Sequence, residues 1–247
     1  MTPGAALAAV WEHLIVGIPA GWTQRTLGVV GGVTGVAVPT VNGVWAYRED
    51  AERDAVLGLL ERVAGAGVPH CVQLAPGCSG KLRELGKERG MRRDVDIPLM
   101  ALTSKRELPQ LEQGDLVIEV LDPEQAVVHA ELAAAGFHAP VEAFLGLMTP
   151  AVLGRPGVRT YVGKIDGEPV ATGVGVCFEN HVGIFNVATL PAHRRHGHGA
   201  AITGRAVRDG LKRGARWAWL QSSSDGYNIY EKLGFRTLEL WECWIAT

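Results

Sequence analysis

The feature that most constrains the fold is an internal repeat: two stretches of this chain contain the same order of expected elements. The run GVTGVAVPTVNGVWAY (32–47) resembles ATGVGVCFENHVGIFNV (171–187), and each is followed by a helical pattern, a strand and a short helix that ends at glycine. KERGMRRDVDIPLMAL (87–102) then parallels EKLGFRTLELWECWIA (231–246). We interpret this repeat as a tandem duplication, with one domain over 1–115 and a second over 116–247.

Each copy is expected to be mixed α/β (α+β), because helical periodicity alternates with β-rich runs. Helices are predicted near 4–15, 50–65, 124–136, 140–148 and 198–213. Asp166-Gly167 and Glu179-Asn180 separate β-rich runs by two residues, which predicts tight hairpins. The β-rich runs between 25 and 47 are interrupted by glycines, and TGVAVP (34–39) is expected to be one of these short strands.

Composition excludes several classes of protein. Hydrophobic residues make up 47% and charged residues 20%, which is ordinary for a globular domain, and the net charge of -2 gives no reason to expect a nucleic-acid partner. No apolar run is long enough to span a bilayer, so no membrane partner is expected. The N-terminal stretch lacks the basic start of a signal peptide and the four cysteines form no CxxC, which together predict a cytoplasmic protein with reduced thiols.

The two copies differ most between strand and helix. The second copy has ATLPAHRRHGHGAA (188–201), whereas the first has only REDAERDA (48–55), which is shorter, acidic and free of glycine. A helix N-terminus offers free N–H groups and a partial positive charge, and glycines let a ligand approach the backbone. With Arg194 and Arg195 beside it, this stretch predicts an anion site, best suited to phosphate, in the second copy alone.

The segment Arg-x-x-Gly-x-Gly (194–199) resembles the acyl-CoA pyrophosphate loop, Gln/Arg-x-x-Gly-x-Gly/Ala, of the GNAT superfamily of acetyltransferases. It differs from the nucleotide motifs GxxxxGK[ST] and GxGxxG. The strand before it ends at Pro191, as such strands often do in that family, and YEKLGF (230–235) resembles the family's later Tyr-x-x-x-Gly-Phe helix end. The resemblance covers roughly 119–247, and the first copy resembles a degenerate version of the same fold, each copy with a mixed, mostly antiparallel sheet flanked by helices.

The resemblance implies acetyl-CoA as co-substrate, wedged between two splayed parallel strands near 183–190 and 216–222. Pyrophosphate would lie on the amides of 195–200, and the pantetheine arm would pair with the backbone of Val187 and Thr189. A backbone amide of the same strand would polarise the thioester carbonyl, as an oxyanion hole does. The cofactor-binding residues implied are Val187, Ala188, Thr189, Arg194, Arg195, His196, Gly197, His198, Gly199, Ala200 and Ser223.

Tyr230 matches the family position that often protonates the departing thiolate, and a phenol is protonated at neutral pH. The alternative is a packed aromatic residue. Many relatives place a glutamate on the strand before the loop, but VGIFNVATLP has no carboxylate, and Asn186 can orient water or substrate without acting as a base. Glu142, Glu179 and His181 are candidate bases, although each is expected to be a surface residue. A water chain, or an amine that arrives already neutral, is the open alternative. Ser223 stands where many relatives have a cofactor-contacting asparagine.

We therefore expect an N-acetyltransferase that moves acetyl directly from acetyl-CoA to a primary amine in a ternary complex, without a metal. His193, His196 and His198 are interpreted as variable loop positions, since no cysteine or carboxylate has zinc-ligand spacing around them. The acceptor, a small-molecule or peptide amine, stays open, as does the choice between monomer and homodimer. The rival hypotheses are a non-catalytic acyl-CoA-binding or sensing module and a structural assembly domain that binds no CoA.

Overall fold

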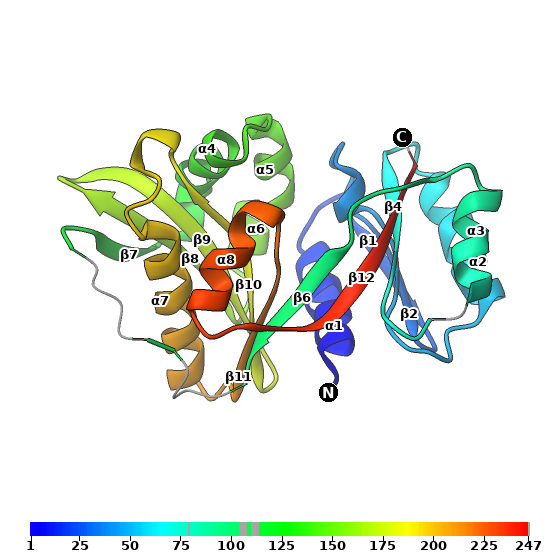
Figure 1. Cartoon of the computed structure of the whole chain (residues 1–247). Coiled ribbons are helices and arrows are strands. Elements are labelled where there is room, and N and C mark those ends of the chain that lie inside the picture. Colours follow the sequence, from blue (N-terminus) through cyan, green and yellow to red (C-terminus); the bar gives the residue numbers. More distant parts are fainter. Residues whose placement is uncertain (79, 104–107, 110–113, 247) are drawn as a thin grey trace. The chain divides into compact units, whose positions relative to one another are not determined.

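The computed structural model describes residues 1–78, 80–103, 108–109 and 114–246, and Figure 1 follows the chain through its elements. The chain forms two compact units. One comprises Met1–Leu99 together with Leu238–Thr247, and the other comprises Met100–Thr237. The first unit therefore includes the C-terminal segment of the sequence, and the second unit begins at Met100, within the part that the sequence assigned to the first copy.

The first unit contains a five-strand path in the order β1-β2-β3-β4-β12, with β5 paired to β12. Its strands are β1 (Trp22–Thr26), β2 (Val29–Val33), β3 (Gly43–Ala46), β4 (His70–Leu74), β5 (Arg92–Arg93) and the end of β12 (Arg236–Ala246). Its helices are α1 (Pro3–Ile15), the 3-10 turn η1 (Pro39–Val41), α2 (Arg53–Ala64) and α3 (Gly80–Glu88). Strands β3 and β4 are parallel and pair along the whole of β3, and α2 packs on β2 and β3.

The expected strand at 34–39 is wrong: this segment is an irregular loop that leads into η1. The buried side chain of Asn42 organises the loop. Its Oδ1 accepts hydrogen bonds from the N–H and the hydroxyl of Thr34, both at 2.8 Å. Its Nδ2 donates to the carbonyls of Val36, Val38 and Pro69. A single side chain thus takes over the hydrogen bonds that a neighbouring strand would otherwise supply.

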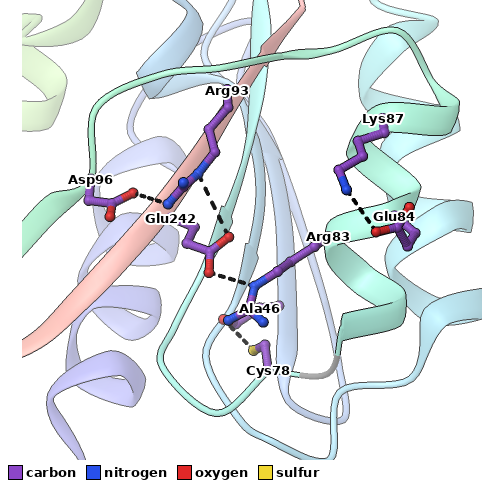
Figure 2. Close-up of polar contacts among 8 residues, drawn as sticks. All are labelled: Ala46, Cys78, Arg83, Glu84, Lys87, Arg93, Asp96 and Glu242. Carbon is purple, nitrogen blue, oxygen red and sulfur yellow. Dashed lines mark hydrogen bonds and ion pairs between the residues drawn. The ribbon is translucent and has the colours of Figure 1, made fainter.

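Charged side chains link β12 to the neighbouring elements of the first unit (Figure 2). The Glu242 carboxylate accepts a hydrogen bond of 2.5 Å from Arg83 Nε on α3 and lies 3.9 Å from Arg93 Nε on β5. Arg93 also donates to Asp96 at 2.6 Å. These pairs are partly exposed, so each adds little to the stability of the unit.

The second unit contains the strand order β6-β11-β10-β9-β8-β7. Its strands are β6 (Ile97–Leu102, of which Met100–Leu102 belong here), β7 (Val117–Leu121), β8 (Val158–Ile165), β9 (Glu168–Phe178), β10 (His181–Thr189) and β11 (Trp217–Gln221). Its helices are α4 (Ala126–Phe137), α5 (Val141–Leu147), α6 (Pro150–Leu153), α7 (His198–Lys212) and α8 (Ser224–Lys232), with 3-10 turns η3 (Pro123–Gln125) and η4 (Pro191–His193).

Strands β7 to β10 are antiparallel and β10 to β11 is parallel. Both predicted hairpins are present, with Asp166 and Glu179 at positive φ in two-residue turns. Neighbouring residues of β9 face opposite helices: Gly173 lies against Ile202 of α7, and Thr172 bonds to His129 of α4. The helices therefore cover both faces of the sheet, and the predicted mixed, mostly antiparallel fold is confirmed.

Within the described part of the chain, no helix combines the length and the apolar character needed to cross a bilayer.

Candidate active site

The parallel strands β10 and β11 separate before either ends. They pair at three positions, from His181 with Trp217 to Gly183 with Trp219, yet β10 continues to Thr189. Among the described residues, the β10 backbone groups that face β11 beyond Gly183 thus have no strand partner. The strands predicted to be splayed are adjacent and parallel, and the predicted residues Val187, Ala188 and Thr189 lie in the part of β10 that is not paired with β11. The described residues of the first unit show no such opening between its parallel strands, because β3 pairs with β4 along its whole length.

A β-bulge interrupts β10 inside this opening. Its register with β9 shifts between Phe185 and Ala188, so Asn186 and Val187 together oppose a single residue of β9. Asn186 has φ of 49°, a left-handed conformation, and its buried Nδ2 has no hydrogen-bond partner among the described residues. A buried amide donor without a partner is costly, which makes it a candidate for contact with a ligand.

The loop at 190–197 leads into helix α7, whose N-terminus has no side-chain cap. It passes through η4, Arg195 has φ of 69° and Gly197 has φ of 80°. No side chain caps the N-terminus of α7, whose first intrahelical bond runs from Ala201 N–H to the Gly197 carbonyl. The N–H groups of His198, Gly199 and Ala200 consequently precede that bond and remain available to an anion.

Gly199 is not required by the protein fold. Its φ is not positive, and a Cβ there would meet only Thr189 Oγ1 and Val187 Cγ1, both at 3.7 Å, an ordinary contact distance. A glycine inside a helix costs about 1 kcal/mol relative to alanine. Because neither backbone nor packing demands it, a ligand lying close to the helix start is the best reason for a glycine at this position.

Three imidazole rings gather at this helix start. The rings of His196 and His198 are stacked with centroids 5.7 Å apart, and His193 lies 6.5 Å from His198. Desolvation lowers the pKa of His198, and the neighbouring His196 and His193 lower it further. No group of three or more metal-binding side chains is arranged to hold a metal ion in the described ranges.

The two loop arginines differ in their contacts. Arg194 Nη2 donates to the Gly136 carbonyl at 2.5 Å, whereas Arg195 has no hydrogen bond or ion pair within the described residues. Nothing in the sequence links Arg194 to Gly136, which lies 58 positions away.

Buried polar contacts hold α7 on the sheet. Asp209 accepts a hydrogen bond from the Tyr161 hydroxyl of β8 at 3.2 Å and pairs with Arg205 at 3.2 Å and with Arg159 at 3.5 Å. Arg205 also donates to the Ile118 carbonyl. The helix that presents the loop is thus anchored near its other end.

Tyr230 lies on α8 and packs against the core of the second unit. Its ring meets Phe235 edge-on at 6.0 Å, and Gly234, at φ of 92°, closes the helix so that Phe235 N–H reaches the Tyr230 carbonyl. Burial raises the pKa of Tyr230 to about 12. Its hydroxyl has no hydrogen bond among the described residues, so it is a free, protonated donor at neutral pH.

Ser223 is the N-cap of α8: its hydroxyl accepts a hydrogen bond from Gly226 N–H at 3.3 Å. This bond occupies one acceptor site of the hydroxyl and leaves its proton available.

Of the candidate bases, Glu142 and Glu179 are exposed as expected, but the expectation for His181 is wrong. His181, the first residue of β10, is fully buried because its ring lies against the rings of Phe178, Trp217 and Trp219. Its Nδ1 accepts from Trp219 Nε1 at 3.1 Å, and burial lowers its pKa to about 4.

The acetyltransferase (GNAT) domain model matches residues 156–237. A GCN5-related N-acetyltransferase from Kribbella flavida has a similar structure, with a TM-score of 0.71, 20% identity, and coverage of 99% of this chain and 95% of that one. One from Sphaerobacter thermophilus gives 0.61 at 19% identity, covering 89% and 76%. A tandem GNAT protein from the clavulanic acid biosynthesis pathway gives 0.59 at 15% identity, covering 95% and 87%. No curated protein matches the chain in sequence.

The matched residues contain the opened strand pair, the loop, the uncapped helix and Tyr230. The second unit therefore carries an acetyltransferase domain of the GNAT superfamily, as the loop predicted, and the chain as a whole has the GNAT fold.

Proposed function

We propose that the second unit transfers an acetyl group from acetyl-CoA to a primary amine by direct attack in a ternary complex. The observation that carries the proposal is the uncapped start of α7, with a glycine that the fold does not need, beside a strand whose outer backbone groups are unpaired. A pyrophosphate fits the first feature and an extended pantetheine amide chain fits the second.

The amine acts through its neutral form. Its lone pair attacks the thioester carbonyl carbon, the oxygen gains negative charge, and the carbon–sulfur bond then breaks as the amide forms. N–H donors at the β10 bulge would stabilise the charged oxygen, and Asn186 Nδ2 supplies a further buried donor beside them. The proton lost by the amine passes to solvent or to an ordered water, since β10 has no carboxylate and His181 is buried.

Tyr230 is proposed as the proton donor to the departing thiolate. With a pKa of about 12 the phenol stays protonated through the neutral and mildly alkaline range, so the donor is present wherever the amine is neutral. The tyrosinate left behind regains its proton from solvent before the next cycle.

Removal of this hydroxyl in Tyr230→Phe is expected to lower kcat by about a hundredfold, with little change in the KM for acetyl-CoA. This is the low end of the usual range for general acid catalysis. It applies because a thiol with a pKa near 8.5 can leave as the thiolate without complete protonation. The measurement is the release of CoA thiol with a panel of small amines and peptides.

Tyr227→Phe is the matched control, since Tyr227 is on the same helix and its hydroxyl bonds to Thr237 at the surface. Equal losses in the two variants would remove Tyr230 from the mechanism. Tight binding of acetyl-CoA without thiol release from any amine would favour the non-catalytic binding module, which the missing carboxylate on β10 supports.

A further inference from the structure

The side chain of Arg194, the first residue of the loop motif, points to helix α4 instead of the helix start of α7. Its Nη2 donates to the Gly136 carbonyl at 2.5 Å and lies 3.4 Å from His138 Nε2, and its Nε lies 3.4 Å from the Thr189 carbonyl. The guanidinium is thus engaged by backbone of α4 and of β10. A swing toward the first amides of α7 would break these contacts.

Helix α4 approaches β10 closely at the same place. A Cβ on Gly136 would lie 2.7 Å from the Ala188 Cβ and 3.2 Å from Thr189 N–H, which only glycine avoids. His138, at φ of 54°, then ends α4 in a left-handed cap. The α4 C-terminus therefore rests directly on the part of β10 that leads into the loop.

The chemistry of this contact favours a structural bond. The last carbonyls of a helix lack intrahelical partners and carry partial negative charge. A guanidinium satisfies one of them with a charge-assisted hydrogen bond, the stronger kind. Arg195 directly follows in the loop and is exposed like Arg194, but it has no such contact within the described chain.

We propose that Arg194 is a positioning residue that fastens the loop to the end of α4, and that Arg195 is the loop cation that meets the ligand phosphates. The role of Arg195 rests on the proposed function, whereas the role of Arg194 is a property of the protein without a ligand.

The test compares Arg194→Gln with Arg195→Gln in two experiments. The first, without ligand, is amide hydrogen exchange of the peptide covering residues 134–140. Arg194→Gln is expected to speed exchange there by about tenfold, as the loss of a charge-assisted bond at a helix end predicts, and Arg195→Gln to leave it unchanged. Arg194→Lys, which keeps the charge without the fork, is expected to restore protection only in part.

The second experiment is calorimetric titration of acetyl-CoA at low and high NaCl concentration. Arg195→Gln is expected to weaken binding at low salt and to flatten its salt dependence, since it removes a screened Coulomb attraction. Arg194→Gln is expected to weaken binding while keeping the wild-type ratio of the two affinities.

Unchanged exchange in Arg194→Gln, together with a flattened salt dependence, would make Arg194 the phosphate ligand and overturn the proposal. If the wild-type protein does not bind acetyl-CoA at all, the proposed function fails, and the exchange experiment alone decides whether Arg194 fastens the loop.

Discussion

Replacement of Gly199 by glutamate is expected to weaken acetyl-CoA binding by more than about a hundredfold while the protein stays folded. The new side chain would start 3.7 Å from Thr189 and Val187, where the fold has room for it. A carboxylate in the first turn of α7 also interacts favourably with the helix dipole, so the helix itself gains stability. The same carboxylate would repel a bound pyrophosphate and occupy its space, and two unit charges about 4 Å apart interact strongly in a partly desolvated site.

Gly58→Glu is the matched control for this variant. Gly58 lies inside α2 of the first unit, it is exposed, and no atom lies within 4 Å of the position of its Cβ. Calorimetric titration of the three proteins, alongside their thermal unfolding, checks the prediction. Wild-type affinity in Gly199→Glu, with both variants folded, would show that the phosphates lie elsewhere.

The second unit is expected to lose stability steeply in mild acid. Both of its fully buried histidines, His129 and His181, are held neutral: burial lowers the pKa of each to about 4. His129 Nδ1 bonds to Thr172 Oγ1 at 2.7 Å, and that hydroxyl donates to the Tyr161 carbonyl at 2.9 Å. The hydroxyl proton is thus already used, so Nδ1 is the donor to Thr172, and Nε2 has no hydrogen-bond partner in the described part of the chain.

The sign of the effect follows from proton uptake. Below its ordinary pKa near 6.5 each histidine binds a proton in the unfolded chain, but in the folded protein it does so only near pH 4. The stability is therefore complete above about pH 6.5 and falls as the pH drops toward 4. Each histidine contributes a loss of about 3 kcal/mol over this window, at about 1.4 kcal/mol per pH unit.

Equilibrium unfolding in urea at pH 7.5, 6 and 5 measures this loss. In His129→Asn, which keeps a donor for Thr172 but does not titrate, the slope of stability against pH below 6 is expected to fall by about half. His196→Gln, in the exposed loop, serves as the control and should keep the wild-type slope. A wild-type stability that is flat between pH 7.5 and 5 would contradict the neutral buried state of both histidines.

Local features of the site were predictable because short stretches of sequence determine them. Asp166-Gly167 forms its hairpin through two residues that tolerate positive φ, and the second hairpin forms at Glu179-Asn180 with Glu179 at positive φ. The start of α7 at His198 follows from Gly197, and the end of α8 from Gly234. The loop motif therefore located the acetyltransferase domain from sequence alone.

Features that depend on distant partners were not predictable. The bond from Arg194 to Gly136 spans 58 positions, and the burial of His181 depends on tryptophans that arrive with β11. The end of β12 pairs with β4 in the first unit while Met100–Leu102 join the second, because any strand with the right alternation can fill an open sheet edge. The irregular segment at 34–39 had β-like composition, and the hydrogen bonds of Asn42 override it.

The most direct test of the central claim is a crystal structure of the full-length protein with acetyl-CoA. The account predicts pyrophosphate oxygens on the amides of residues 195–200, the pantetheine arm along the β11-facing side of Val187 and Thr189, and the thioester carbonyl near the bulge at Asn186. Acetyl-CoA bound outside the opening between β10 and β11, or phosphates held without the start of α7, would contradict it.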